Sequence, residues 1–347
     1  MTRKNVQVLL AIVVALILTI FAVETTDDPS SISQGQPLLP GFSEQANEAQ
    51  RVRVLFSDAD PLAIRREAGN WVISARDDYL ADLGKLRQFI LALAEARVIE
   101  EKTSNPDLYE KLGVNDPEDG GSGAKVSVSG EGFSYTVILG DSAQGNHRYV
   151  RLADEQSSYL IDKDPDLSQE IGDWLQPDIL DIDSKRIRTV SIEHDNGEKI
   201  TIEKSAEELT DFTALDIPEG RELSYATIGN GIAGALKQLE LDDVRKAREG
   251  APVTSAVFET WGGLRIRAAV STDNDESWVA FAAEETPVES DTEPPDDPGA
   301  QALKVDEDES AADINARVSG WQYRLPDHKK NLLVRRWEDI LKSTDED

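Results

Sequence analysis

Residues Val6–Val23 read VQVLLAIVVALILTIFAV, an apolar run that only Gln7 and Thr19 interrupt with polar side chains. As an α-helix, a stretch of this length would rise about 27 Å, close to the thickness of the hydrocarbon core of a bilayer. Because lipid is the solvent that suits such a run best, the sequence predicts a single transmembrane helix at the N-terminus. We therefore expect this helix to anchor the rest of the chain to a membrane.

The charges that flank this run predict its orientation. Arg3 and Lys4 precede it and Glu24 follows it, and basic flanks are held on the cytoplasmic side of a membrane. We expect the N-terminus in the cytoplasm and the remainder of the chain exported. A cleaved signal peptide shares the basic start and the apolar core, so this alternative stays open. The sequence FAVE at 21–24 does not match a small-x-small cleavage site.

The composition excludes several classes of function. The chain has 67 acidic and 36 basic residues, a formal net charge of −31, three histidines and no cysteine. An acidic surface of this strength repels nucleic acid and anionic lipid headgroups. Without cysteine there is no disulfide and no thiol for lipoprotein acylation. With so few nitrogen and sulfur ligands we expect no transition-metal site, and no motif predicts a cofactor.

Composition also suggests how the chain divides. Residues 24–50 are rich in Ser, Gln, Pro and Gly without apolar periodicity, which predicts a flexible tether. The exported part is long enough for two cores, and we expect domains at 51–180 and 181–347. Within the second domain, residues 284–310 hold eleven acidic residues, four prolines and one lysine, which predicts a disordered acidic loop.

Alternating apolar and polar residues separated by turn signals predict antiparallel hairpins in both domains. The segments are 51–56, 62–64, 69–73, 125–139, 149–152, 158–161, 187–193, 199–203, 254–261, 264–270 and 277–283. Amphipathic helices are expected over 80–98, around 228–239 and near the C-terminus from Leu332 to Leu341. The predicted fold class is α+β: an N-terminal transmembrane helix, then two degenerate repeats of antiparallel hairpin-rich sheet covered by amphipathic helices.

No residue pattern indicates catalysis. Gly229-Asn230-Gly231-Ile232-Ala233-Gly234 matches G-x-G-x-x-G, but a dinucleotide loop needs a buried strand directly before it, and residues 225–228 are a poor candidate. We interpret these glycines as helix positions that allow close packing. His147, His194 and His328 lie in separate segments, and no nucleophile elbow or distinctive carboxylate pair stands out. We expect a protein that is not an enzyme.

Four segments carry a resemblance to a known family. They are the apolar N-terminus, GNWVI at 69–73 with the helix after it, NPDLYEKLG at 105–113, and GWQYRLP at 320–326. In these segments the chain resembles the bacterial family called domain of unknown function 4340. The resemblance implies a membrane-anchored exported subunit that accompanies ABC-type transport systems related to gliding-motility auxiliary components. It carries no catalytic residue over to this sequence.

The candidate interaction surface is part of that third segment, and its residues are Asn105, Tyr109, Lys111 and Gly113. We expect a noncatalytic, periplasmic accessory or scaffold subunit of an ABC-type transport or cell-envelope assembly, anchored in the bacterial inner membrane. Its expected partners are that membrane and an ABC-transporter permease or auxiliary membrane subunit, and not nucleic acid.

Two alternatives of other classes stay open. An envelope hydrolase would show two carboxylates with raised pKa values converging in an apolar cleft. A polysaccharide-binding module would show an exposed row of Trp and Tyr on one face of a sheet.

Overall fold

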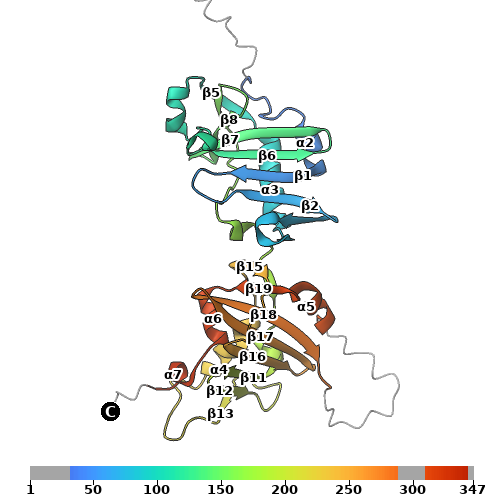
Figure 1. Cartoon of the computed structure of the whole chain (residues 1–347), viewed down its shortest axis with the longest axis vertical. Coiled ribbons are helices and arrows are strands. Elements are labelled where there is room, and N and C mark those ends of the chain that lie inside the picture. Colours follow the sequence, from blue (N-terminus) through green and yellow to red (C-terminus); the bar gives the residue numbers. More distant parts are fainter. Residues whose placement is uncertain (1–31, 288–308, 343–347) are drawn as a thin grey trace, which may run out of the picture. The chain divides into compact units, whose positions relative to one another are not determined.

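The computed structural model describes residues 32–287 and 309–342 (Figure 1). Most of these residues belong to antiparallel β-sheets, and the helices are few and short. The predicted α+β fold class is therefore wrong, because the described part of the chain is mainly antiparallel β. The predicted anchor Val6–Val23 lies outside these residues. Among the residues described, no helix has the length and apolar character needed to cross a membrane.

The chain forms two compact units. Unit 1 comprises the described residues up to Gly69 together with Leu83–Gln169, and unit 2 comprises Asn70–Asp82 together with the described residues from Glu170 onward. A short segment from the first half of the sequence thus belongs to the unit formed by the second half. The expected domains 51–180 and 181–347 stay a prediction.

The first sheet has the strand order β4-β3-β2-β1-β6-β7-β8-β9-β5. Its strands are β1 Ala49–Leu55, β2 Leu62–Glu67, β3 Asn70–Ile73, β4 Tyr79–Leu80, β5 Val98–Thr103, β6 Ala124–Gly130, β7 Phe133–Ala143, β8 His147–Leu152 and β9 Ser158–Ile161. Alternation directs Val52 and Val54 to one face, where they pair with Val128 and Val126. Helix α3 (Leu83–Glu95) packs its apolar side into the same core.

Ordered structure begins before Arg51. Leu38 and Phe42 are fully buried, and the Phe42 ring lies 5.0 Å from that of Tyr135. Phe42 opens the short helix α2 (Phe42–Gln45). The last part of the segment expected to be a tether therefore packs on unit 1, because isolated apolar residues without periodicity can still fill a core.

The second sheet has the order β13-β12-β11-β16-β17-β18-β19-β15. Its strands are β11 Ile187–His194, β12 Lys199–Glu203, β13 Thr213–Leu215, β15 Asp243–Lys246, β16 Thr254–Thr260, β17 Leu264–Asp273, β18 Glu276–Glu285 and β19 Trp321–Arg324. A separate pair joins β10 (Asp178–Leu180) to β14 (Leu239–Glu240). Seven strands of each sheet follow one order, since β2-β1-β6-β7-β8-β9-β5 corresponds to β12-β11-β16-β17-β18-β19-β15.

The helices of unit 2 are shorter than the sequence predicts, and this is why the α+β fold class fails. The helix expected around 228–239 is only α4 (Ile228–Ala233) with a 3₁₀ turn η7 (Gly234–Leu236). Three glycines within seven residues each cost about 1 kcal/mol of helix propensity relative to alanine, so the apolar spacing does not extend the helix. The expected C-terminal helix is divided into α6 (Asp327–Leu333) and α7 (Trp337–Ile340).

One further helix, α5 (Ala311–Val318), precedes β19 and begins with a capping box between Ser310 and Asp313. Of the acidic segment 284–310, residues 288–308 lie outside the described part of the chain, while Glu284 and Glu285 end strand β18.

Candidate functional site

The segment expected to be an interaction surface forms a tight 3₁₀ turn, η3 (Pro106–Leu112), in unit 1. Asn105 caps it, since its side chain accepts a hydrogen bond from the Asp107 N–H at 3.1 Å. Gly113 ends it with φ of +65°, in the left-handed region that glycine adopts without strain. These two residues therefore shape the turn.

Tyr109 fixes this turn onto the outward face of the first sheet. Its ring packs with Val114 and Ile138, the Arg151 guanidinium lies 4.8 Å from the ring centre, and its hydroxyl donates to the Gln156 carbonyl. Burial raises the pKa of this phenol. Of the four residues named from the sequence, Asn105 and Lys111 are exposed, whereas Tyr109 and Gly113 are buried. Their role as an interaction surface stays a prediction.

The glycines of the G-x-G-x-x-G match have different environments. Gly229 lies against strand β12 and the residue before β13, where an added Cβ would be 2.9 Å from the Phe212 Cβ and 3.6 Å from the Ile202 Cγ2. At Gly231 the nearest atom would be Leu332 Cδ2 at 3.9 Å. Close packing therefore explains Gly229, and no strand leads directly into α4 as a dinucleotide loop requires.

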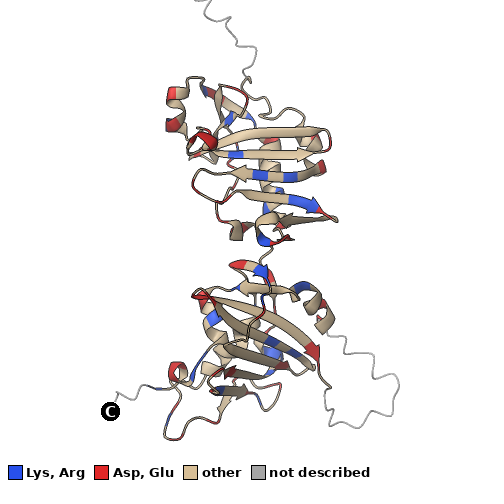
Figure 2. Ribbon diagram, viewed as in Figure 1, with Lys and Arg blue, Asp and Glu red and all other residues tan. Residues whose placement is uncertain are grey.

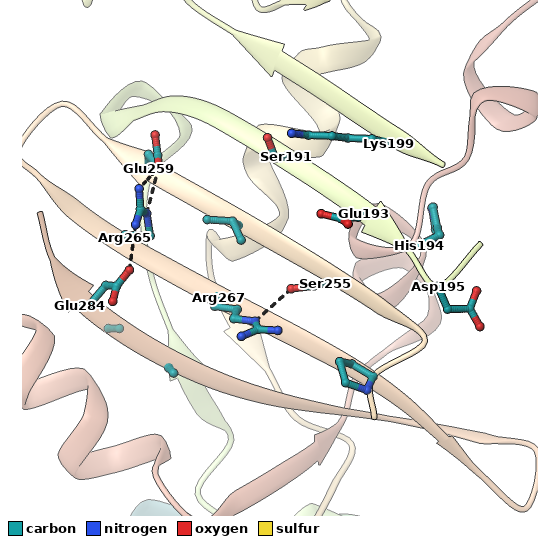
Figure 3. A pocket seen from close by; sticks show the side chains of 14 residues that line it. Ser191, Glu193, His194, Asp195, Lys199, Ser255, Glu259, Arg265, Arg267 and Glu284 are labelled. Atoms are coloured by element: carbon teal, nitrogen blue, oxygen red, sulfur yellow. Dashed lines mark hydrogen bonds and ion pairs between the residues drawn. The ribbon is translucent and has the colours of Figure 1, made fainter. Parts of the chain in front are cut away.

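A concave surface lies on the outward face of the second sheet, within unit 2 (Figure 3). It is a groove of about 750 Å³ over strands β11, β12, β16, β17 and β18. Alternation decides which side chains reach it, because Val190 and Ile192 enter the core while Ser191 and Glu193 face the groove.

The strand registers arrange the groove in cross-strand rows. One row consists of Thr201, Ser191, Val257, Arg267 and Ala282, and the next consists of Lys199, Glu193, Ser255, Ala269 and Ala280. Of these residues, all except Thr201, Ala269 and Ala280 line the groove. Most of the side chains in the middle of these rows end at a methyl or hydroxyl group. The floor between β16 and β18 is therefore low, and the backbone of another molecule can approach it closely.

The charges of the groove are unequally paired. Arg265 donates to Glu259 at 2.6 Å and to Glu284 at 3.0 Å (Figure 3), and these hydrogen bonds raise the pKa of the guanidinium. Arg267, two positions along the same strand, donates from Nε to Ser255 Oγ at 3.0 Å. Within the described residues neither Arg267 nor Lys199 forms an ion pair with a carboxylate. Two cations of the groove are thus available to a ligand. Glu193 and Asp195 line the same groove and likewise form no ion pair within the described residues, and Glu193 lies directly opposite Lys199.

His194 borders the groove but is only 4% exposed. Its Nδ1 lies 2.9 Å from Thr254 Oγ1 and its Nε2 lies 3.0 Å from the Arg335 carbonyl oxygen. A ring whose Nε2–H donates to the carbonyl and whose Nδ1 faces the hydroxyl satisfies both contacts. The side chain is therefore a structural tie to the C-terminal segment.

The same C-terminal segment is tied by Glu198, which follows the turn after β11. Glu198 accepts from the Trp337 N–H at 2.8 Å and from the Arg336 guanidinium at 2.6 Å. Burial opposes ionisation of this carboxyl, but the two hydrogen bonds hold its pKa below the ordinary value.

Neither alternative function finds its expected sign in the described residues. Where the pKa of a carboxyl is displaced there, it is lowered, at Asp183, Glu198, Glu222, Asp273, Asp313 and Asp327. A general acid requires a raised pKa. The only large aromatic side chain that is strongly exposed there is Tyr225, and the same part of the chain holds no cluster of three potential metal ligands.

Sequence reasoning missed Arg267 and the short side chains around it. The signal was present in the alternation of LRIRAAV at 264–270 and of the neighbouring strands, whose outward positions hold Ala and Ser where longer polar side chains are usual. Only the register shows that these positions lie side by side.

Comparison with known protein families matches residues 71–255, more than half of the chain, to a family described as "Domain of unknown function (DUF4340)". No curated protein and no solved structure matches the chain.

Proposed function

Since the chain belongs to the DUF4340 family, as its sequence resemblance indicated, and since that family has no assigned activity, we propose a function from the groove itself. The protein is a noncatalytic accessory subunit of a cell-envelope assembly, and it holds a partner protein on the outward face of strands β11, β12 and β16–β18. The observation that carries this proposal is the open floor of short side chains beside two cations without carboxylate partners.

The proposed partner is a membrane subunit of an ABC-type transport system, as the family resemblance implies. The proposed location is the periplasmic side of the inner membrane, with the N-terminus in the cytoplasm. The apolar segment 6–23 and the basic residues Arg3 and Lys4 support this location. A protein of net charge −31 is repelled by anionic lipid, so attachment through an apolar segment and through a partner protein fits its composition.

Copurification tests the proposal. The full chain, purified from its native membrane in mild detergent, should retain a transport subunit. Ala282 is exposed on the groove floor, and Ala282→Trp should fill the hollow and release that subunit. Ser134 is an exposed, outward position in β7 of the first sheet, and Ser134→Trp is the matched control that should retain it. Equal retention by both variants would contradict the groove as the contact.

A further inference from the structure

The edges of the two sheets differ in how the chain covers them. An edge strand presents unpaired backbone N–H and C=O groups, and proteins usually cover or distort such an edge. The edge strands are β4 and β5 in the first sheet and β13 and β15 in the second. Which of them is left open therefore indicates where another chain can add.

Both edges of the first sheet are covered by other parts of the chain. At β4, the Leu80 carbonyl accepts a hydrogen bond from the Gln176 N–H at 2.9 Å. At β5, the Val98 N–H donates to the Gln36 carbonyl at 3.0 Å, and the Val98 carbonyl accepts from the Gly35 N–H at 2.7 Å. Two register shifts make the rest of β5 irregular, which weakens an edge as a template for a further strand.

In the second sheet, β15 is covered by side chains. The Val244 N–H donates to the Asp243 carboxylate at 2.8 Å, and the Lys246 N–H donates to the Asp77 carboxylate at 3.4 Å. These bonds occupy two backbone donors of the strand, so a further strand would have to displace them.

Strand β13 has no such cover among the described residues (Figure 1). Within that part of the chain its strand partner is β12 alone, and no group outside β12 bonds to Thr213, Ala214 or Leu215. Every second residue of such a strand directs its N–H and its C=O away from the sheet. The strand is held from inside, because Phe212 is buried and its N–H donates to the Asn230 side chain at 2.9 Å. The open edge is therefore preformed.

Apolar side chains are exposed on both sides of this edge. Leu209 precedes the strand and is 48% exposed, and Ile217 follows it and is 37% exposed. Leu215 lies opposite Thr201, on the outward face of the sheet. A strand that added to β13 could remove part of this apolar surface from water.

The charges of the connections around β13 have one sign. Residues 205–220 contain no basic residue. They contain five exposed carboxylates that form no ion pair within the described residues, Glu207, Glu208, Asp211, Asp216 and Glu219. A second copy of this chain would bring like charges together, which destabilises a strand pair. The edge therefore disfavours self-association and favours a basic strand.

The nearest basic residues do not cancel this charge. Lys204 is buried and its Nζ donates to the Lys185 carbonyl at 3.0 Å. Arg221 donates to the Lys342 carbonyl at 2.8 Å. On the outward side of β12, Glu203 and Lys199 contribute one charge of each sign, so the surroundings of β13 stay negative.

We infer that the open edge of β13 receives an extended segment of a partner protein, which adds as a strand and carries lysine or arginine beside β-branched apolar residues. Backbone hydrogen bonds supply affinity in this mode of recognition, and the alternate side chains supply specificity. No residue of β13 lines the groove. The contact thus goes beyond the proposed function and is tested separately from it.

A blocked fluorescent peptide of sequence KVTVKVTVK, which alternates basic and β-branched residues, is the probe. Added to the full chain in detergent, it should bind saturably, and more weakly as salt is added. The peptide EVTVEVTVE should not bind. Neither should KVPVKVPVK, which keeps every lysine but whose prolines cannot donate to a strand pair. The infrared amide band of an isotope-labelled carbonyl in the first peptide should move to the β-sheet frequency on binding.

Three variants of the full chain locate the site. Glu208→Gln combined with Asp216→Asn should weaken binding about tenfold, and asparagine tolerates the φ of +52° at position 216. Asp58→Asn with Asp60→Asn is the matched control, since both are exposed carboxylates of the turn after β1 without an ion pair in the described residues. This control and Ala282→Trp should bind the peptide normally. Circular dichroism melts would establish that each variant is folded.

Absence of saturable binding, or equal binding of the proline peptide, would overturn the inference. Equal binding by the native chain and by the variant at positions 208 and 216 would overturn it as well. If Ala282→Trp abolishes peptide binding, the peptide lies in the groove, so the inference fails and the proposed function stands. If Ala282→Trp retains both the peptide and the copurified subunit, the proposed function fails instead.

Discussion

Gly229 and Gly231 lie two residues apart in helix α4, yet alanine should affect them in opposite directions. A Cβ at Gly229 would be 2.9 Å from the Phe212 Cβ and 3.2 Å from its carbonyl oxygen, whereas at Gly231 the nearest atom would be Leu332 Cδ2 at 3.9 Å, an ordinary van der Waals contact. We predict that Gly229→Ala lowers the free energy of unfolding by about 1–3 kcal/mol through overpacking. Gly231→Ala should raise it by up to about 1 kcal/mol through helix propensity. Urea denaturation of both variants measures the difference.

Stabilisation by both substitutions would show that Gly229 is not packed closely. A nucleotide that bound the folded protein at these glycines would raise its melting temperature. Millimolar NAD, FAD or ATP should leave the melting temperature of the native chain unchanged.

Glu198 predicts a pH dependence of stability. Its pKa is lowered in the folded protein by the Trp337 and Arg336 hydrogen bonds, so its contribution is complete above the ordinary carboxyl pKa and is lost as pH falls through the lower folded value. Glu198→Gln should therefore cost about 1–2 kcal/mol at pH 7. The difference from the native protein should shrink below about pH 4. Urea denaturation at pH 7, 5 and 3 tests this, and a difference that is constant over this range would contradict it.

At the scale of elements, the first sheet places two arginines opposite each other, one of which, Arg65, also forms an ion pair with Glu67. Arg51 in β1 lies directly opposite Arg65 in β2, in a region where Figure 2 shows basic residues on both strands. Like charges in this position repel. We predict that Arg51→Glu raises the free energy of unfolding by about 0.2–1 kcal/mol at low salt, and that the gain falls with added salt. Arg53→Glu, opposite Ala63, should gain less, and an equal gain would argue against a specific pair.

Hairpins were the elements predicted best from the sequence, because a strand with one buried face alternates apolar and polar residues. Residues 125–139, 187–203 and 254–283 were expected as hairpins or a meander and form β6–β7, β11–β12 and β16–β18. The length of the helix expected around 228–239 was overestimated, because the spacing of its apolar residues does not reflect the helix propensity that three glycines remove. The groove could not be predicted, because the register of five strands decides which side chains line it. Its Arg267 is distinguished only by the absence of a carboxylate partner among the described residues.

At the scale of the whole molecule, the charges around segment 6–23 predict the side of the membrane. A reporter fused after Gln50 should be active if it requires export and silent if it requires the cytoplasm, because Arg3 and Lys4 precede the apolar run and acidic residues follow it. A fusion lacking residues 1–23 is the control and should reverse both results. Activity of the cytoplasmic reporter in the intact fusion would contradict the proposed location.

Local patterns could not predict which segments of the chain belong to unit 2, because its contacts join residues far apart in sequence. Arg76 donates to Asp243 at 2.5 Å, and the Tyr79 ring meets the Trp321 ring edge-on at 4.9 Å. Burial raises the pKa of Tyr79 to about 12. A segment that reads as an ordinary hairpin of the first half thus supplies part of the core of the second.

This arrangement predicts how fragments of the chain behave. A fragment of residues 170–347 lacks Asn70–Asp82, so it leaves Trp321 and Tyr323 without the Tyr79 ring and Asp243 without Arg76. Loss of a buried aromatic typically costs about 3–5 kcal/mol, so the fragment should melt at a clearly lower temperature than the full chain. A synthetic peptide of residues 70–82 should raise that melting temperature in a saturable way. The same peptide with Tyr79→Ala and Arg76→Ala should not, and stabilisation by both peptides alike would show that these side chains do not complete unit 2.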